Sequence, residues 1–299
     1  MPLLTRAAAT VAGLGAATVA YGCLYERNAF TLREFTVPVL APGTAALRLL
    51  HISDVHMMPR QARKQAWLRE LATLKPDLVV NTGDHISALN AVPALLRALE
   101  PLMAFPGAFV PGNNDYYAAI RKSPAHYFTK TSPDRRLGAP LPWPAIAEAI
   151  SDGGWLDLTH VRKTLTVGAA GVPVALAGTD DPHLRRARYE RIAGAADPAA
   201  VVRIGVAHSP EPFLLRAFAD DGYDLVLAGH THGGQIRVPF GPAITTNCGI
   251  DVHRARWLHP WDERMWFHVC AGLGTSPYMP IRLACRPEAS LLTLTARAG

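Results

Sequence analysis

The chain has 299 residues, of which 49% are hydrophobic, 18% are charged and 25 are prolines, a composition that suits a compact, loop-rich protein with one large core or two modest ones. A net charge of +6 favours anionic partners, but no dense Lys/Arg block interleaved with aromatic residues is present, which argues against a specific nucleic-acid-binding module. The four cysteines form no CxxC pair, which argues against a cysteine zinc site; Cys248, Cys270 and Cys285 leave open either one disulfide or free thiols.

Residues 1–27 are predicted to be a signal anchor or a cleaved signal peptide. The run from Ala7 to Leu24 carries no charge, and its length approaches the ~20 residues that a helix needs to cross a bilayer. Its Ala and Gly content makes it only weakly hydrophobic, so a cleaved signal and an amphiphilic cytoplasmic tail stay open as alternatives. Arg6 precedes the run, whereas Glu26 and Arg27 nearly cancel after it, which favours a single-pass protein of the cell membrane with an extracytoplasmic body.

The rest of the chain divides into a tether and one domain. Residues 28–46 are predicted to be a tether with a short strand, Phe35–Val39, and residues 47–299 a single domain in which strands alternate with helices over Gln61–Leu74 and Val92–Leu102. Such alternation predicts an α/β fold. Later strands at Gln235–Pro239, Trp266–Ala271 and Ser290–Ala296 lack intervening helices, so we expect a mixed sheet completed by antiparallel strands.

Residues 118–144 interrupt this alternation. The segment is rich in Pro, Arg and Lys, with aromatic residues such as Tyr127, Phe128 and Trp143 among them. It is expected to be either a plain surface insertion or a lid or membrane-facing flap beside the site.

Metal-type side chains follow five of the predicted strands. Leu47–Ile52, Leu78–Val80, Phe109–Val110, Ile204–Ala207 and the apolar run 225–227 each lead into polar residues. The candidate metal ligands are Asp54, His56, Asp84, Asn113, His208, His230 and His232. A mixed nitrogen and oxygen set without thiolate suits Mn²⁺, Fe or Zn²⁺, and seven ligands suit two divalent ions sharing a carboxylate. Two such ions can clamp a phosphate and activate water for in-line attack.

These residues carry a family resemblance. The blocks Asp54-Val55-His56, Gly83-Asp84, Gly112-Asn113-x-Asp115, His208 and Gly229-His230-x-His232 resemble the motifs of calcineurin-like metallophosphoesterases, from about Leu47 to the end of the chain. Further blocks, at 231–235, 272–276 and 285–288, resemble a bacterial, membrane-anchored branch related to UDP-2,3-diacylglucosamine pyrophosphatases. The sequence Asn113-Asn114-Asp115, together with the block at 179–183, is similar to actinobacterial members.

The resemblance implies a four-layer α/β/β/α sandwich with the metals at the strand ends. It implies one ion held by Asp54, His56 and His232, and a second held by Asn113, His208 and His230. Asp84 would bridge both ions.

One position departs from the family pattern, which places a histidine after the metal-binding asparagine, paired with the next acid. Here Asn114 precedes Asp115, and both are candidate catalytic residues together with His85. The missing histidine is usually assigned to stabilising the transition state or protonating the leaving oxygen, help typically worth about 10²–10⁴-fold. Asn114 is predicted to donate a hydrogen bond to a phosphoryl oxygen, combined with a substrate whose leaving group needs no acid; the alternative is that His85 or His183 replaces the acid.

Other polar residues have two interpretations each. His85 is expected to be a loop histidine unless it takes the catalytic role above, and Asp180 and Asp181 either orient the imidazoles or cap a turn. His253, His259 and His268 are expected to be structural or at the surface.

The sequence thus predicts a dinuclear metal-dependent phosphoesterase that hydrolyses phosphodiester or pyrophosphate bonds by attack of a metal-bound water or hydroxide. The expected substrate is envelope-linked or lipid-linked. The protein is expected to contact the membrane through its N-terminal helix. The alternatives are a soluble nucleotide phosphodiesterase or phosphatase, and a catalytically idle metal-binding scaffold.

Overall fold

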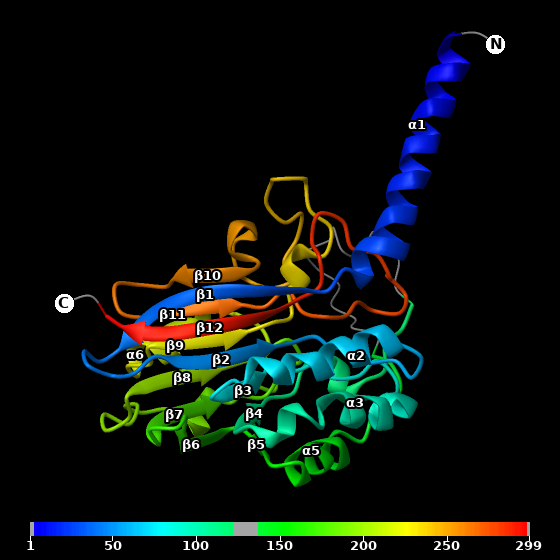
Figure 1. Ribbon diagram of the computed structural model, residues 1–299. Coiled ribbons are helices and arrows are strands. Elements are labelled where there is room, and N and C mark those ends of the chain that lie inside the picture. Colours follow the sequence, from blue (N-terminus) through cyan, green and yellow to red (C-terminus); the bar gives the residue numbers. More distant parts are fainter. Residues whose placement is uncertain (1–2, 122–136, 298–299) are drawn as a thin grey trace.

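The computed structural model describes residues 3–121 and 137–297, and its strands form two six-stranded mixed sheets (Figure 1). The first sheet has the order β1 (Thr31–Leu40), β12 (Glu288–Ala296), β2 (Leu47–Ile52), β3 (Leu78–Asn81), β4 (Gly107–Phe109), β5 (Trp155–Asp157). The second has the order β10 (Trp257–Pro260), β11 (Trp266–Val269), β9 (Leu225–Ala228), β8 (Val202–Val206), β7 (Val172–Gly178), β6 (Val161–Val167). The α-helices of the described residues are α1 (Leu3–Ala20), α2 (Ala62–Glu70), α3 (Val92–Leu99), α4 (Asn113–Tyr116), α5 (Trp143–Asp152) and α6 (Pro212–Asp220).

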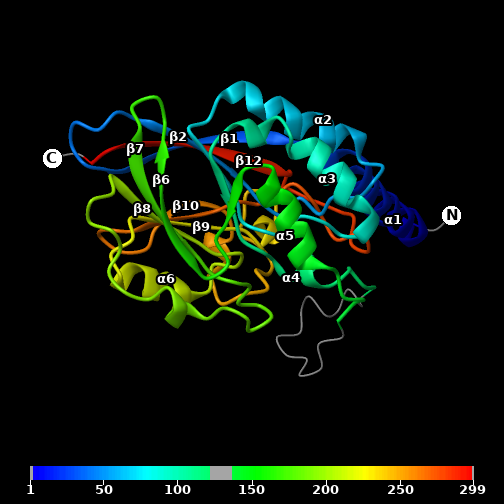
Figure 2. The same cartoon turned by 90° about the horizontal axis from the view of Figure 1, so that it is seen from below.

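Three apolar clusters separate four layers. Because side chains alternate across a strand, Leu49 of β2 packs between the two sheets, whereas its neighbour Leu50 packs under α2, α3 and α5. On the far side, Val226 of β9 packs against Phe218 of α6. The helices therefore cover both outer faces of the paired sheets (Figure 2), and the predicted four-layer α/β/β/α sandwich is confirmed.

The predicted tether is wrong over much of its length, because β1 is a ten-residue strand of the first sheet. It pairs in parallel with β12, with Phe35 opposite Leu292. Val37 and Leu40 have no exposed surface, since they face the space between the sheets. Pro38 is tolerated because β1 lies at the edge of the sheet, where a missing N–H leaves no strand unpaired. The strand belongs to the folded body.

The predicted strand Gln235–Pro239 is also wrong. Ile236 and Arg237 form only isolated bridges, with Leu283 and Ala243. Gln235 has a φ of 53°, which turns the chain out of an extended path. The apparent alternation of apolar and polar residues reflects a turn in which Arg237, not the apolar side chains, is buried.

Other boundaries shift by a few residues. The predicted helix Gln61–Leu74 is α2 followed by a 3₁₀ turn, and Val92–Leu102 is α3 alone. The late strands are confirmed as a mixture: β12 is antiparallel to β2 but parallel to β1, and β11 is parallel to β9. All four cysteines carry free thiols, so the disulfide alternative is not realised.

Helix α1 stands clear of the body (Figure 1). Most of it belongs to a helical stretch, Thr5–Asn28, that is long and apolar enough to cross a membrane by length and composition, with mean hydropathy 1.5. Its apolar side chains are exposed, Val11 by 70%. Much of the predicted insertion 118–144, residues 122–136, lies outside the described residues.

Candidate metal centre

The predicted ligands lie on five loops where the two sheets meet. Asp54 and His56 follow β2, Asp84 follows β3, and Asn113 follows β4, all in the first sheet. His208 follows β8, and His230 and His232 follow β9, in the second. Carboxyl ends of parallel strands share an edge of a sheet, so the two facing edges bring all these side chains to one place.

One group of ligand atoms converges tightly. Asp54, His56, Asp84 and His232 each offer one atom, and these atoms lie within 4.8 Å of one another. His56 Nε2 lies 3.3 Å from Asp84 Oδ2 and 3.2 Å from His232 Nε2. His232 Nε2 lies 3.5 Å from Asp54 Oδ1.

A second group shares Asp84. His208 Nε2 lies 3.5 Å from Asp84 Oδ2, and His230 Nδ1 lies 3.3 Å from His208 Nε2. Asn113 follows Gly112, where an added Cβ would lie only 2.3 Å from Asp84 Oδ1 and 2.6 Å from His208 Cε1. The structure therefore brings six of the predicted ligands together, Asp84 among them, and Asn113 follows Gly112 beside the Asp84 carboxylate.

The unpaired atoms fit a metal. Within the described residues, the buried oxygens Asp54 Oδ1 and Asn113 Oδ1 accept no hydrogen bond. His208 Nδ1 lies 2.7 Å from the Thr82 carbonyl and His232 Nδ1 lies 3.2 Å from the Gly274 carbonyl. Since a carbonyl only accepts, His208 carries a proton on Nδ1 and turns Nε2 towards the centre, whereas His232 Nδ1 also lies 3.4 Å from Arg282 Nη2. Two carboxylates, an amide oxygen and four imidazoles are donors for divalent transition metals.

Backbone strain concentrates at the same residues. Five ligands have φ in the left-handed region: Asp54 (47°), His56 (42°), Asp84 (54°), His230 (68°) and His232 (50°). Each such residue costs on the order of 1 kcal/mol or more and persists only where the surroundings impose it. This is the pattern expected of a site that fixes its ligands before the metal arrives.

The charges at the centre are coupled. Burial alone would raise the pKa of Asp84, but His208, with His56 and Asn114, holds it well below its usual value. Burial would likewise lower the pKa of His208, but Asp84 raises it well above 6.5. Burial raises the pKa of Asp54 to about 6. Asp84 and His208 thus each stabilise the charged form of the other.

A chain of hydrogen bonds runs from Asp54 into the space between the sheets. Ser53 Oγ donates to Asp54 Oδ2 (2.6 Å), and Thr82 Oγ1 donates to Ser53 Oγ (2.6 Å). Because the Thr82 hydroxyl already donates its hydrogen to Ser53, it accepts a hydrogen bond from His51 Nε2 at 3.1 Å. His51 Nδ1 then accepts from His268 Nδ1 at 2.9 Å.

Both histidines of this chain are neutral. Burial lowers the pKa of His51 to about 3 and that of His268 well below 6.5. The Asp54 carboxylate, which can only accept, therefore sets the direction of every hydrogen bond in the chain. His268, expected from the sequence to be structural or at the surface, is buried.

Asn114, Asp115 and His85, the residues with predicted catalytic roles, contact Asp84 or one another. Asn114 donates to Asp84 through its backbone N–H (2.7 Å) and through Nδ2 (2.6 Å). Asp115 accepts from the backbone N–H groups of Asp84, His85 and Gly112, and from His85 Nδ1. Asp115 thus holds the two loops together, and the catalytic roles of all three stay predictions.

The two alternative proton donors lie in different places. His85 is buried, and its ring stacks on Trp143 at 5.5 Å between centroids. The ring of His183 lies 4.5 Å from that of His230. Asp181 accepts from the backbone N–H groups of His183 and Leu184, so it caps the turn that presents His183.

Two buried cations were missed by the sequence analysis. Lys64 of α2 donates from Nζ to the carbonyl of Val55, between the ligands Asp54 and His56 (2.7 Å). Arg282 donates from Nη2 to the carbonyls of Gly272 (3.0 Å) and Gly274 (2.7 Å), beside His232. A single charge in an otherwise ordinary segment gives no signal of burial.

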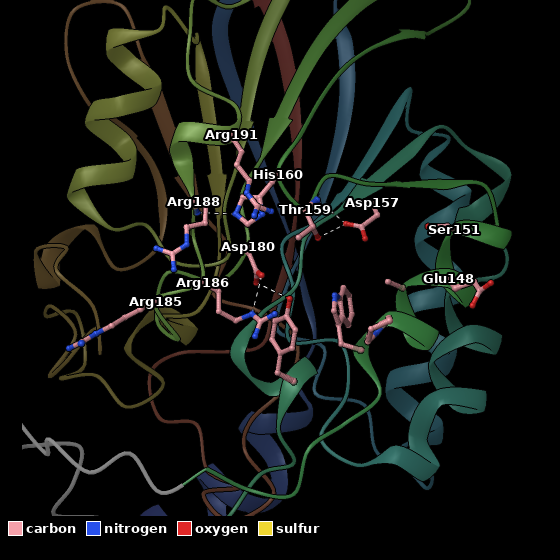
Figure 3. Close-up of a pocket in the computed structure, with 14 residues that line it drawn as sticks. Glu148, Ser151, Asp157, Thr159, His160, Asp180, Arg185, Arg186, Arg188 and Arg191 are labelled. Atoms are coloured by element: carbon pink, nitrogen blue, oxygen red, sulfur yellow. Dashed lines mark hydrogen bonds and ion pairs between the residues drawn. The ribbon is translucent and has the colours of Figure 1, made fainter.

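A cleft of about 730 Å³ lies beside the candidate metal centre (Figure 3). Helix α4 connects the two, because it begins at Asn113 and ends at Tyr116, which lines the cleft. Tyr116 of α4 donates to Asp180 Oδ1 (2.9 Å), and Arg186 binds Asp180 Oδ2 (3.0 Å) while its guanidinium lies over the Tyr116 ring. Arg185, Arg188 and Arg191 also line the cleft. None of the seven ligands lines it, so it is a neighbour of the metal centre and not the centre itself.

Comparisons with known proteins agree with this geometry. The calcineurin-like phosphoesterase family matches residues 47–234, more than half of the chain. The Bacillus subtilis protein YpbG is 29% identical over 88% of this chain and 87% of its own length. The Escherichia coli phosphodiesterase YaeI is 25% identical over 97% of each chain. A transmembrane protein with a metallophosphoesterase domain from Danio rerio is 25% identical over 87% of this chain and 56% of its own length.

The family match spans the loops of all seven ligands, from Asp54 to His232. Membership accounts for the metal-type donors at the sheet edges and makes the protein a metal-dependent hydrolase of phosphoester bonds. The chain belongs to the calcineurin-like phosphoesterase family.

Proposed function

We propose that the protein is a dinuclear phosphoesterase that cleaves phosphodiester or pyrophosphate bonds of an envelope-linked or lipid-linked substrate. The observation that carries the dinuclear assignment is the position of Asp84 Oδ2, within 3.3 Å of His56 Nε2 and 3.5 Å of His208 Nε2. Asp54, His56 and His232 would hold one divalent ion, and Asn113, His208 and His230 the other. Bound there, two such ions supply charge neutralisation at phosphorus and a water of lowered pKa.

The chain's own residues then orient the reaction. The Thr82 carbonyl accepts from His208 Nδ1 and orients that ring, and the Gly274 carbonyl and the Arg282 guanidinium both lie beside His232 Nδ1. Asn114 Nδ2 donates one hydrogen to Asp84 Oδ2, and its second hydrogen would serve a phosphoryl oxygen. His183, beside His230, is the candidate to protonate a poor leaving group.

The location follows from α1. We propose a single-pass protein of the cell membrane with an extracytoplasmic catalytic body, in line with the resemblance to the bacterial membrane-anchored branch. Arg6 precedes the apolar run, and Glu26 and Arg27 nearly cancel just after it. The arginines of the cleft beside α4 are suited to a second anionic group on the substrate.

Hydrolysis of bis(p-nitrophenyl) phosphate by the full chain in detergent with Mn²⁺ tests the function. Asp84→Asn, which preserves the volume of the side chain, should remove both activity and bound metal measured by elemental analysis. Asp220→Asn, an exposed acid of α6, is the matched control and should change neither. Full activity in Asp84→Asn would contradict the proposal.

A further inference from the structure

The base of the N-terminal helix is fixed to one loop of the body. Gly22 packs so tightly that an added Cβ would lie 2.7 Å from the Arg282 carbonyl oxygen and 2.8 Å from Ile281. Glu26, only 3% exposed, accepts from the backbone N–H of Cys285 at 2.7 Å. The end of the apolar helix is therefore held on residues 281–285.

The same loop supports the metal centre. The guanidinium of Arg282, which has no exposed surface, donates to the carbonyl oxygens of Gly274 (2.7 Å) and His232 (3.4 Å). Cys285 Sγ donates to the carbonyl of His232 at 3.2 Å. A single residue, Arg282, thus stands between Gly22 and the ligand His232.

Beyond His232 the chain forms an exposed apolar turn. Gly241 N donates to the Val238 carbonyl at 2.8 Å and closes the turn, with Phe240 at its tip. Phe240 is fully exposed, and Val238 and Ile244 are exposed by 55% and 47%. Phe240 has a φ of 61°, a strained backbone conformation for an aromatic residue. Its ring is exposed to solvent.

This turn lies beside the loop on which α1 rests. Gln235 Nε2 donates to the Met279 carbonyl (3.0 Å), and Ile236 pairs with Leu283. Tyr278, in the same loop, is 54% exposed. In Figure 1 the turn, drawn in gold, rises from the body on the side from which α1 leaves. We call Val238, Phe240, Ile244 and Tyr278 the apolar rim.

A bilayer is the partner that fits the apolar rim. Transfer of apolar surface out of water is favourable, so a fully exposed phenylalanine at a turn tip gains most from an apolar phase. Aromatic side chains with a polar end, such as Tyr278, favour the membrane interface. Arg286, exposed and adjacent to Cys285, adds a cation that attracts anionic headgroups.

We propose that the apolar rim enters the interface of the same bilayer that α1 spans, so that the metal centre faces the membrane surface. The phosphoester then belongs to an amphiphile resident in that membrane and not to a freely diffusing molecule. This inference rests on the membrane-anchored phosphoesterase proposed above.

Fluorescence quenching tests the contact without requiring catalysis. The full chain is reconstituted in vesicles of phosphatidylglycerol and phosphatidylethanolamine, with or without bromine on the acyl chains. Phe240→Trp and Tyr278→Trp add reporters in the rim, and Phe213→Trp is the matched control, since Phe213 is also 54% exposed but lies on α6, over the outer face of the second sheet. Each variant fluoresces more than wild type because of its added tryptophan. Brominated lipid should quench most of this added fluorescence in Phe240→Trp and Tyr278→Trp, and little of it in Phe213→Trp.

Equal quenching at 240 and 213 would overturn the inference, as would wild-type protein that does not float with the vesicles. The proposed function is tested separately. Absence of phosphodiesterase activity with Mn²⁺ would contradict the proposed hydrolase activity, and the quenching pattern would still report whether the apolar rim contacts the membrane. The rim side chains are exposed, so each reporter should fold, which an unchanged thermal midpoint in detergent confirms.

Discussion

Thr82 joins the ligand carboxylate of Asp54 to the histidine pair between the sheets. Thr82→Val removes the hydroxyl at nearly constant volume, so Ser53 and His51 lose their shared partner. Residues that orient metal ligands typically contribute about 10–100-fold in metal affinity. We expect Mn²⁺ affinity, measured by calorimetry, to fall by at least about tenfold.

Thr179→Val is the matched control. Thr179 is also fully buried, but its hydroxyl has no hydrogen-bond partner in the described part of the chain. Its replacement should leave metal affinity unchanged. Equal affinities in the two variants would show that the chain from His268 to Asp54 does not position the ligand.

His183 tests what replaces the family histidine at position 114. If His183 protonates the leaving oxygen, His183→Asn should slow hydrolysis of alkyl phosphoesters by about 10²–10⁴-fold and leave p-nitrophenyl esters nearly unaffected, because a nitrophenolate needs no proton. Rates across leaving groups of different pKa measure this. Asn114→His, which restores the family residue, should flatten the dependence on leaving group.

A loss that is the same for every leaving group would exclude His183 as the acid. His253→Asn, an exposed histidine on another loop, serves as the control. If Asn114→His also leaves the dependence unchanged, proton transfer is not the function of position 114 either.

The convergence of the candidate metal ligands could be predicted from the sequence because each follows an apolar run, and strand ends gather at a sheet edge. The residues that orient them could not. His51 lies inside the run Leu47–Ile52, where the sequence indicates only a strand residue. Nothing in that run predicts the hydrogen bond between its ring and Thr82. Positive φ at Asp54 and Asp84 is imposed by contacts between loops and has no local signature in these residue types.

At the scale of elements, α2 supports the first ligand loop through a buried lysine. Burial, with smaller effects from Arg282 and Arg27, lowers the pKa of Lys64 from 10.5 to about 7. Between these values the unfolded chain binds a proton that the folded chain does not. The free energy of unfolding contributed by Lys64 therefore rises with pH across this window and is lowest below pH 7.

Lys64→Met removes that dependence. A pKa unit corresponds to about 1.4 kcal/mol, so the stability of wild type relative to Lys64→Met should increase by on the order of 2 kcal/mol between pH 7 and pH 9. Urea unfolding of metal-free protein measures it. The lost hydrogen bond to Val55 lowers stability equally at both pH values, so a difference that does not change with pH would contradict the lowered pKa.

Element predictions failed where residues far apart in sequence decide the outcome. Strand β1 was predicted as five residues within a tether because nothing near it reveals its partner β12, more than 250 residues away. At Gln235–Pro239 the alternation of Ile236 and Val238 resembles a strand, but Arg237 binds the carbonyls of Gly233 and Gly241 and curls the segment into a turn.

At the scale of the whole molecule, the boundary between anchor and body lies earlier than residue 28. The sequence places that boundary after Arg27, where the apolar run has ended. Glu26 and Gly22 nevertheless pack on residues 281–285, and that loop in turn contacts His232. The N-terminal helix and the candidate metal centre are therefore parts of one structure, which no local pattern in either segment reveals.

Truncation separates these two boundaries. A chain of residues 22–299 keeps the contacts of Gly22 and Glu26, whereas residues 28–299 leave the buried N–H of Cys285 without an acceptor, at a cost of about 1–3 kcal/mol. A domain of this size loses about 2–4 °C in thermal midpoint per kcal/mol, so the shorter chain should melt several degrees lower and bind Mn²⁺ more weakly. In the full chain, Glu26→Gln retains an oxygen that can accept from Cys285 and should behave as wild type, while Glu26→Ala should resemble the shorter truncation. Identical melting and metal affinity for the two truncated chains would show that the anchor does not support the metal centre.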